Sequence, residues 1–179
     1  MRGHDASPSG PEFEDFLRRY TPALHRLVWA YVRTTADADD LFQEITIALW
    51  KALPNFRQDC SERTYVYRVA HNTAISFVTS TKRHTQRERE PEEHEQHFIS
   101  SMNPEREAME NQQRQRLRNA VRELPVTDRQ IVLLYLEGLS TSEMESVTGF
   151  TAGKIAMRLT RIRKRLAQQL GPVSAGEIQ

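Results

Sequence analysis

Residues Glu123–Leu166, ELPVTDRQIVLLYLEGLSTSEMESVTGFTAGKIAMRLTRIRKRL, contain proline, serine, threonine and glycine at positions that mark where helices start and end. Proline is tolerated in the first turn of a helix and glycine commonly follows the last turn, so the segment divides into three consecutive helices. We predict a helix that starts at Pro125 and Thr127 and runs to Leu136, an end at Gly138, a short helix capped by Ser140 or Thr141 and closed by Gly149, and a third helix that begins near Thr151. The last two form a helix-turn-helix, whose second helix enters the major groove of DNA by its N-terminal part.

The third helix of this segment separates cationic from apolar side chains. At about 100° per residue, one stripe holds Lys154, Arg158, Arg161 and Arg165, and its neighbour holds Ile155, Leu159, Ile162 and Leu166. Like charges at i,i+4 cost an isolated helix roughly 0.2–0.5 kcal/mol per pair, so a polyanion or counterions must relieve the cationic stripe. A solvated charged face is the common alternative, but the helix-turn-helix favours DNA, with Arg158 and Arg161 placed for base edges or phosphates. Arg163, Lys164 and Arg165 better suit the DNA backbone.

Composition limits the class of protein and its compartment. The chain has 179 residues, of which 27% are charged, and its mean hydropathy is -0.66, as expected of a soluble protein with one domain or two small ones. No apolar run approaches the roughly 20 residues of a membrane helix, so we expect no membrane insertion. The N-terminus MRGHDASPSGPEF lacks the apolar core of a signal peptide, and Cys60 has no disulfide partner, so we expect a cytoplasmic protein.

The formal net charge of +1 conceals an alternation along the chain. The net charge is −2 over 1–56, +3 over 57–90, −2 over 91–123 and +3 over 124–170. Two basic segments separated by acidic ones indicate two surfaces that face nucleic acid.

Helical periodicity runs almost unbroken from Phe13 to about Ser80. After Arg83 the chain becomes rich in charge and poor in large apolar residues, and packing resumes near Leu117. No strand pattern competes, so the predicted fold class is all-α, with two small helical domains joined by a flexible acidic linker. The predicted boundaries are a tail over 1–11, a first domain over 12–84, a linker over 85–113, a second domain over 114–171 and a tail over 172–179.

The predicted helix from about Arg63 carries a second candidate surface for nucleic acid. Its apolar face is predicted to hold Val66, Val69, Ala70, Thr73 and Phe77, and its polar face Arg68, His71, Asn72, Ile75, Thr79 and Lys82. Tyr65 and Tyr67 flank the polar face, and aromatic rings beside cations and amides suit unpaired bases, which stack on rings. Spacing leaves open the alternative that both tyrosines are core residues with exposed hydroxyls.

An acidic cluster opens an earlier predicted helix, with Asp37 at the expected N-cap. Asp37 and Asp39 interact favourably with the helix dipole. Asp40 and Glu44, however, form a like-charged i,i+4 pair, which is unfavourable unless a basic partner covers it. The cluster therefore suggests a protein partner.

Nothing in the sequence indicates catalysis. Metal-capable side chains, namely Glu92, Glu93, His94, Glu95 and His97, lie in the predicted linker, without the fixed scaffold that a preorganised site requires. No glycine-rich phosphate loop or nucleophile motif is present. We expect a protein that is not an enzyme and that binds no metal or cofactor.

Three segments in this order resemble an extracytoplasmic-function sigma factor, the compact two-domain branch of the bacterial sigma-70 family. DADDLFQEITIALWKAL resembles the acidic polymerase-binding helix of the family, and FRQDCSERTYVYRVAHNTAISFVTSTKR its promoter-melting segment. Glu123–Leu166 resembles the C-terminal helix-turn-helix, which alone is weakly specific because response regulators share a similar pattern. The order of all three, with an acidic linker between them, makes the resemblance specific.

The resemblance implies three sets of site residues, none of them catalytic. The acidic set, facing the clamp-helix coiled coil of the largest polymerase subunit, is Asp37, Asp39, Asp40, Gln43 and Glu44. The minus-ten set, capturing unpaired bases and the adjoining phosphates, is Asp59, Cys60, Ser61, Tyr65, Arg68, His71, Asn72, Lys82 and Arg83. The minus-thirty-five set, reading duplex DNA, is Thr151, Lys154, Met157, Arg158, Arg161 and Arg165.

The resemblance implies a promoter-specificity subunit whose partners are core RNA polymerase and promoter DNA. Members of the family are commonly restrained by an anti-sigma factor, which is a further candidate partner. One alternative is a free-standing helix-turn-helix regulator that binds duplex DNA without polymerase. An alternative of another class is that the N-terminal domain serves only protein interactions.

The sequence departs from the family pattern at several positions. The family usually has Trp at Tyr65, Gly near Gln58 and a small residue at Glu145, and it opens the recognition helix differently from Ala152–Lys154. A carboxylate at a tight helix–helix contact would cost several kcal/mol if left unpaired. We therefore predict that Glu145 lies at the surface or meets an arginine.

Overall fold

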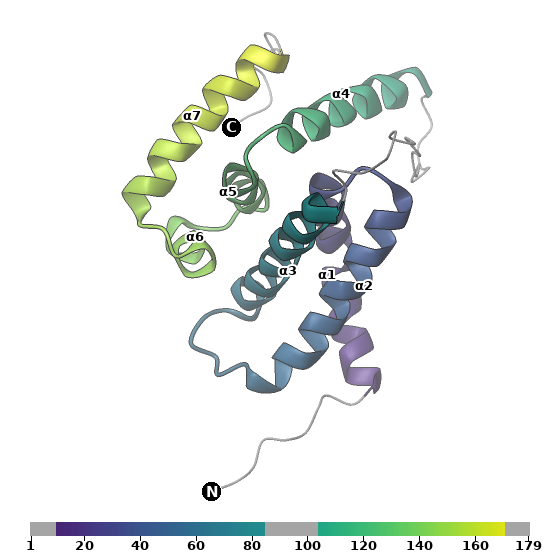
Figure 1. Ribbon diagram of the computed structural model, residues 1–179, viewed down its shortest axis with the longest axis vertical. Coiled ribbons are helices and arrows are strands. Elements are labelled where there is room, and N and C mark those ends of the chain that lie inside the picture. The colour runs from purple at the N-terminus through teal and green to yellow at the C-terminus, as the bar shows by residue number, and fades with distance from the viewer. Residues whose placement is uncertain (1–9, 85–103, 171–179) are drawn as a thin grey trace, which may run out of the picture.

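A computed structural model describes residues 10–84 and 104–170, with side chains described over 10–80 and 112–170. Every regular element in these ranges is helical (Figure 1). The elements are α1 (Gly10–Tyr31), α2 (Thr35–Ala52), the 3-10 turn η1 (Leu53–Asn55), α3 (Glu62–His84), α4 (Pro104–Arg122), α5 (Val126–Leu136), α6 (Thr141–Thr148) and α7 (Ala152–Leu170). The prediction of an all-α fold with two helical domains is confirmed.

Helices α1, α2 and α3 form the N-terminal domain around a shared apolar core. Leu24, Leu41, Ile45 and Val66 are fully buried, and they come from all three helices. Burying a side chain of this size stabilises a fold by roughly 1.5–3 kcal/mol, so these residues hold the three helices together. The opposite side of α2 is left free for polar side chains.

Helices α5, α6 and α7 form the C-terminal domain, and α6 and α7 are its helix-turn-helix. The residues predicted to start and end these helices are confirmed. Ser140 caps α6 and forms a reciprocal capping box with Glu143. Gly138 and Gly149 adopt φ values of +72° and +70°, the left-handed region that glycine enters without steric cost. Pro125 stands immediately before α5, as predicted.

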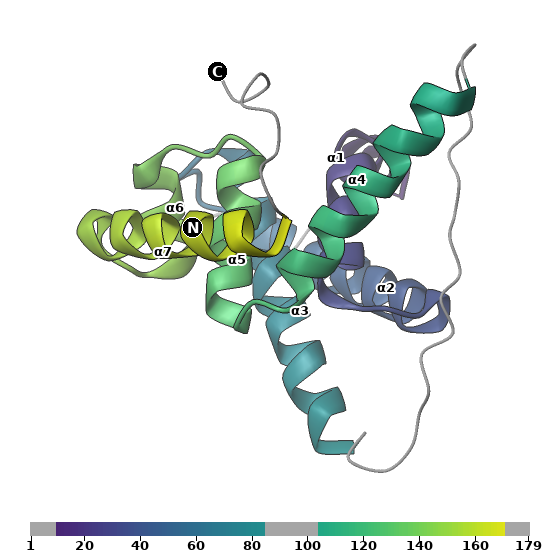
Figure 2. The ribbon, with the colours of Figure 1, turned by 90° about the horizontal axis from the view of Figure 1, so that it is seen from above.

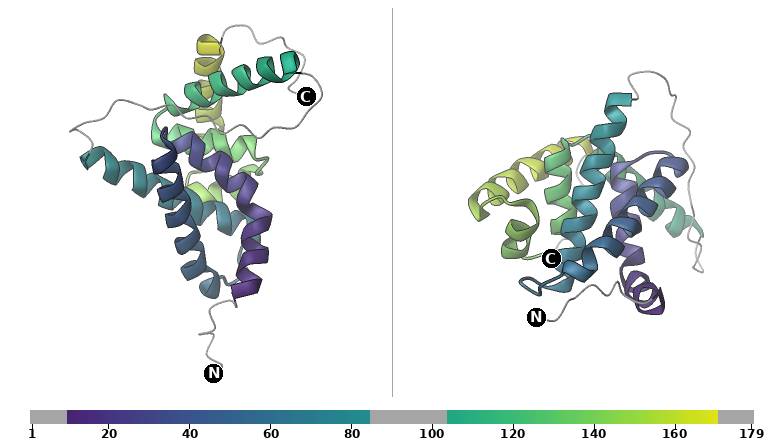
Figure 3. Two further views of the ribbon diagram at one scale, coloured as in Figure 1. Left: turned by 90° about the vertical axis from the view of Figure 1, so that its right-hand side faces the viewer. Right: turned by 60° about the horizontal axis from the view of Figure 1, so that its bottom comes forward.

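The two domains are packed against each other, with α3 in the middle. Helices α1 and α2 lie on one side of α3, and α5 and α6 lie on the other (Figures 1 and 3). Helix α4 joins the C-terminal domain and runs beside α1, which gives a second region of contact between the domains (Figure 2).

Three predicted boundaries differ from the structure. Helix α1 begins at Gly10, so residues 10 and 11 are helical, and α4 places residues 104–113 of the predicted linker in a helix. The N-cap of α2 is Thr34 rather than Asp37, because the Thr34 hydroxyl accepts a hydrogen bond from the Asp37 amide at 3.1 Å. Residues 1–9, 85–103 and 171–179, which hold the rest of the predicted tails and linker, lie outside the described residues.

Candidate nucleic-acid interface

Helix α7 presents most of the minus-thirty-five set to solvent. Ile155 and Ile162 are buried against the rest of the domain, which turns the opposite face of the helix outward. The exposed members of the set are Thr151, which immediately precedes α7, and Lys154, Met157, Arg161 and Arg165 on α7. Met157 is 61% exposed, so an apolar side chain lies at the surface among these polar and cationic residues.

Arg158 departs from the predicted cationic stripe. Its guanidinium forms an ion pair with Asp128 of α5 and lies 5.4 Å from the centroid of the Phe150 ring, and its side chain is 24% exposed. Arg158 therefore faces α5 in this structure, whereas the sequence predicts it on the outward cationic stripe with access to base edges or phosphates. Sequence reasoning missed Asp128, because a carboxylate in the first turn of a helix is adequately explained by the helix dipole.

Phe150 also positions Lys154. The Lys154 ammonium lies 3.9 Å from the ring centroid of Phe150, a cation–π contact that limits where the charge sits at the start of α7. Phe150 thus organises two of the cations of the recognition helix.

Glu145 occupies the turn between α6 and α7 rather than a buried helix contact. It is partly exposed, and its Oε1 accepts a hydrogen bond of 2.6 Å from the amide of Ala152, the first residue of α7. A carboxylate at a helix N-terminus is stabilised by the helix dipole and satisfies an otherwise unpaired amide. The prediction of a surface position is confirmed, with a backbone amide as the partner in place of an arginine.

Part of the minus-ten set gathers around the loop before α3. Asp59 and Ser61 are exposed, and Cys60 is partly exposed. The Arg68 guanidinium reaches the Cys60 thiol at 3.9 Å and lies 5.2 Å from the Tyr65 ring centroid. The structure therefore places a thiol, a guanidinium and an aromatic ring side by side.

Tyr65 and Tyr67 differ in their surroundings. Tyr65 is partly exposed, donates a hydrogen bond of 2.8 Å to the Ala52 carbonyl and packs its ring on Phe56. Tyr67 is only 3% exposed, so for Tyr67 the alternative of a core aromatic is correct. A ring fixed and partly exposed beside Arg68 is compatible with base stacking at Tyr65.

The loop before α3 contains a residue in a strained conformation. Gln58 has a φ of +61°, the left-handed region that disfavours residues with a Cβ atom. This is the position near which the resembled family carries glycine, so the chain retains the backbone turn without the residue that forms it most easily.

The predicted exposed polar face of α3 is wrong at His71. This side chain is 1% exposed, its Nδ1 is 3.0 Å from the Tyr31 hydroxyl, and its Nε2 has no hydrogen-bond partner among the described residues. Burial lowers the pKa of His71 to about 3, although the nearby carboxylate of Glu137 opposes this shift. Helix α3 is covered on two sides, so its buried face is wider than the buried face of a helix packed on one side only. This wider face includes His71.

The other predicted members on α3 have mixed outcomes. Asn72 is exposed, as predicted, while Ile75 is partly buried. Lys82 and Arg83 lie in the last turns of α3, and their side chains are outside the described residues.

Helix α2 presents the acidic set. Asp39, Asp40, Gln43 and Glu44 are exposed, and Asp37 is partly exposed and accepts a hydrogen bond from the Thr34 hydroxyl at 2.7 Å. Ile47, one turn further along, is 44% exposed and adds an apolar side chain to this face. An acidic helix face bordered by an exposed aliphatic residue is suited to a basic protein partner.

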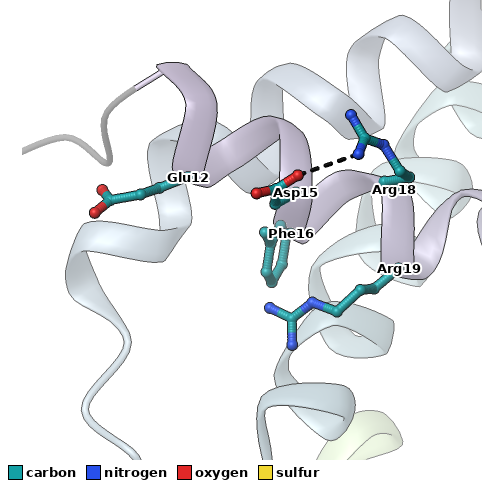
Figure 4. Close-up of a pocket in the computed structure, with 5 residues that line it drawn as sticks. All are labelled: Glu12, Asp15, Phe16, Arg18 and Arg19. Carbon is teal, nitrogen blue, oxygen red and sulfur yellow. Dashed lines mark ion pairs between the residues drawn. The ribbon is translucent and has the colours of Figure 1, made fainter.

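A shallow hollow on α1 is not part of any of the three predicted sets of site residues. It is lined by Glu12, Asp15, Phe16, Arg18 and Arg19, and a 3.3 Å ion pair joins Arg18 to Asp15 (Figure 4). Within the described residues no three acidic, histidine or cysteine side chains form a group that could hold a metal ion. None of the helices in the described ranges is long and apolar enough to cross a membrane.

Comparison with known proteins agrees with this geometry. The family model for Sigma-70 region 2 matches residues 16–84, and that for Sigma-70 region 4 matches residues 114–166. The chain is 27% identical to the ECF RNA polymerase sigma factor SigM of Mycobacterium tuberculosis over 165 residues, which cover 92% of this chain and 80% of that protein. It is 28% identical to the ECF RNA polymerase sigma-E factor of Escherichia coli over 168 residues, which cover 90% of this chain and 87% of that protein.

Solved structures share the fold. The sigma factor RpoE in complex with the anti-sigma factor NepR from Bartonella quintana has a TM-score of 0.69 at 19% identity and covers 88% of this chain and 96% of its own. CnrH in complex with the cytosolic domain of CnrY has a TM-score of 0.65 at 19% identity and covers 92% of this chain and 90% of its own. With an N-terminal region-2 domain and a C-terminal region-4 helix-turn-helix, the chain belongs to the sigma-70 family of RNA polymerase sigma factors, in its extracytoplasmic-function branch.

Proposed function

We propose that this protein directs transcription initiation by binding core RNA polymerase through the acidic set of α2 and promoter DNA through α3 and α7. The observation that carries the proposal is the presence, on one chain, of both family domains in the family order. The free-standing regulator is disfavoured because it leaves the region-2 match of the N-terminal domain without a role.

The finer parts of the proposal rest on the exposed surfaces. The acidic set binds the basic clamp-helix coiled coil of the largest polymerase subunit, since Asp40 and Glu44 gain a counter-charge there. The protein acts in the cytoplasm and has no catalytic activity of its own. An anti-sigma factor restrains it by binding it, and the support is that the structurally similar sigma factor RpoE of Bartonella quintana forms a complex with the anti-sigma factor NepR.

Reversing the charge of the acidic set tests the proposed function. We expect Asp40→Arg with Glu44→Arg to weaken binding to core RNA polymerase at least about 20-fold, because two attractive charge pairs become repulsive. The measurement is the fluorescence anisotropy of labelled protein titrated with core polymerase at fixed ionic strength.

A matched control reverses two exposed acidic residues on α1, Glu14→Arg with Asp15→Arg, and should keep the wild-type affinity. Equal affinity of the α2 variant and wild type would contradict the assignment of this face. Failure of the wild type to bind polymerase, together with binding of duplex DNA by the protein alone, would favour the free-standing regulator.

A second prediction separates the two cations of α7 that contact Phe150. Lys154→Ala should weaken binding of the polymerase-bound protein to a minus-thirty-five duplex about 5-fold and reduce the salt dependence by about one phosphate contact, because Lys154 is exposed. Arg158→Ala should instead lower the free energy of unfolding by about 1–2 kcal/mol, since it leaves Asp128, which is 14% exposed, without its partner.

Binding isotherms at several salt concentrations and urea denaturation of both variants distinguish these outcomes. Loss of DNA affinity by Arg158→Ala with unchanged stability would show that Arg158 leaves Asp128 to contact DNA.

A further inference from the structure

Glu137, which follows α5 in the C-terminal domain, is bound by side chains of the N-terminal domain. Its Oε1 and Oε2 accept hydrogen bonds from the Arg26 guanidinium at 2.7 Å and 2.9 Å, a bidentate pair. Oε2 also accepts a hydrogen bond from the Tyr67 hydroxyl at 2.8 Å, and the Glu137 carbonyl accepts one from Arg63. Three side chains from α1 and α3 thus converge on one residue across the domain boundary.

The environment of Glu137 makes this contact more than a surface ion pair. The Glu137 side chain is 18% exposed, although that of Arg26 is 60% exposed, so solvent screens the Arg26 side of the pair more than the Glu137 side. Burial raises the pKa of this carboxyl, but the hydrogen bonds from Arg26 and Tyr67 and the nearby guanidinium charges outweigh burial and keep the pKa below its usual value. The carboxylate is therefore charged and held at neutral pH.

Further contacts join the domains on either side of Glu137. Thr64 of α3 donates a hydrogen bond of 3.2 Å to Glu143, the partner of Ser140 in the capping box of α6. At the other end of the interface, Arg33 pairs with Glu123 at 2.6 Å, and Arg122 donates to the Trp29 carbonyl at 2.8 Å. Glu137 lies between these contacts in the chain and, within the described residues, accepts four hydrogen bonds from the opposite domain.

The closed arrangement is incompatible with binding both promoter elements at once. The names of the minus-ten and minus-thirty-five elements place them about 25 base pairs apart, or roughly 85 Å of B-form DNA at about 3.4 Å per base pair. Helices α3 and α6 are in direct contact in this structure, so the surfaces on α3 and α7 cannot be separated by that distance. The domains must part before both elements are engaged.

We propose that Glu137 with Arg26, Arg63 and Tyr67 is a latch that holds the free protein closed, and that release of this latch regulates its binding to core RNA polymerase. The regulatory part rests on the proposed function. A protein whose binding-competent open form is a minor population binds with an affinity reduced by that fraction, so weakening the latch increases the apparent affinity.

The test uses the full-length chain and a charge exchange across the interface. Arg26→Glu and Glu137→Arg each place like charges opposite one another, and the double variant restores an oppositely charged pair. A compact chain of this length has a radius of gyration of about 16 Å. Small-angle X-ray scattering of the free protein should show a radius of gyration about 3–5 Å larger for each single variant than for the wild type. The double variant should return toward the wild-type value.

Binding to core polymerase is measured on the same proteins. Each single variant should bind about 10-fold more tightly than the wild type, and the double variant should lose most of that gain. Arg18→Glu is the matched control, because Arg18 is exposed and pairs only within α1 in the described contacts, and it should change neither quantity. Circular dichroism establishes that each variant is folded.

The two readouts separate the latch from the function on which it rests. Unchanged radii of gyration in folded single variants would overturn the latch, and larger radii with unchanged polymerase affinity would overturn its regulatory role. If neither wild type nor variants bind polymerase, the proposed function fails and the regulatory role with it, while scattering alone still decides whether the latch exists.

Discussion

Replacement of Arg129 by alanine should lower the free energy of unfolding by about 3 kcal/mol. The residue is 7% exposed, and its guanidinium donates hydrogen bonds to the carbonyls of Tyr31 at 3.3 Å, of Leu124 at 3.2 Å and of Arg122. These carbonyls lie at and just beyond the ends of α1 and α4, where the last carbonyls of a helix have no partner within it. Each buried acceptor left unpaired costs roughly 1–3 kcal/mol.

The geometry of the guanidinium matters as well as its charge. Arg129 also lies over the Tyr31 ring, 5.5 Å from its centroid. Lysine keeps the charge but is a single point donor without the planar fork, so Arg129→Lys should recover less than half of the lost stability. Urea denaturation of the intact chain measures both changes.

Arg116, exposed on α4, supplies the control. Arg116→Ala should change the free energy of unfolding by less than about 0.5 kcal/mol, as is usual for surface substitutions. A loss below about 1 kcal/mol for Arg129→Ala would mean that water or neighbouring amides satisfy the three carbonyls as well as Arg129 does.

Local sequence signals predicted the helix-turn-helix well. The turns at Gly138 and Gly149 and the cap at Ser140 depend on backbone conformations and short-range hydrogen bonds, which the residue types themselves specify. The exposed cations Lys154 and Arg161 follow from helical periodicity in the same way. Features that depend on one or two turns of chain can be read without the tertiary structure.

The errors arose where distant segments meet. His71 was assigned to an exposed face because its position on α3 was judged against one apolar stripe, whereas α3 is covered from both sides. The predicted outward position of Arg158 missed its contact with Asp128, because Asp128 stands 30 residues earlier in the chain. The interdomain contacts of Glu137 could not be predicted from the sequence, because a glutamate beside a helix-ending glycine is common. Its role is visible only once the fold brings Arg26 and Tyr67 to it.

The helical start of α4 shows a different limitation. Residues 104–113 have the composition of a linker, rich in charge and poor in large apolar side chains, and they were predicted as one. Glutamate, glutamine and arginine are nevertheless good helix formers, so composition alone does not distinguish a solvated helix from a linker.

The burial of His71 predicts a loss of stability in mild acid. The Tyr31 hydroxyl occupies Nδ1, Nε2 is unpartnered, and Tyr67 and Arg129 lie nearby, Tyr67 beside the His71 ring and Arg129 over the Tyr31 ring. The folded protein keeps the imidazole neutral, with a pKa of about 3, whereas an unfolded histidine has a pKa of about 6.5. The unfolded state therefore binds one more proton below pH 6.5, so stability falls as pH falls, until the pH reaches the folded pKa.

The expected slope is about 1.4 kcal/mol per pH unit, or about 3 kcal/mol between pH 6.5 and pH 4.3, measured by urea denaturation across this range. The folded-state pKa of Glu137 is lowered by its hydrogen bonds, against the opposing effect of burial, so its contribution is lost only at lower pH, below its unfolded value of about 4.5.

His71→Gln should abolish most of the slope, because the amide can still meet the Tyr31 hydroxyl but does not titrate. His25→Gln, at a partly exposed position stacked on Phe42, should retain the slope. A slope that persists in His71→Gln would mean that another titrating group carries it and that the burial of His71 is not its cause.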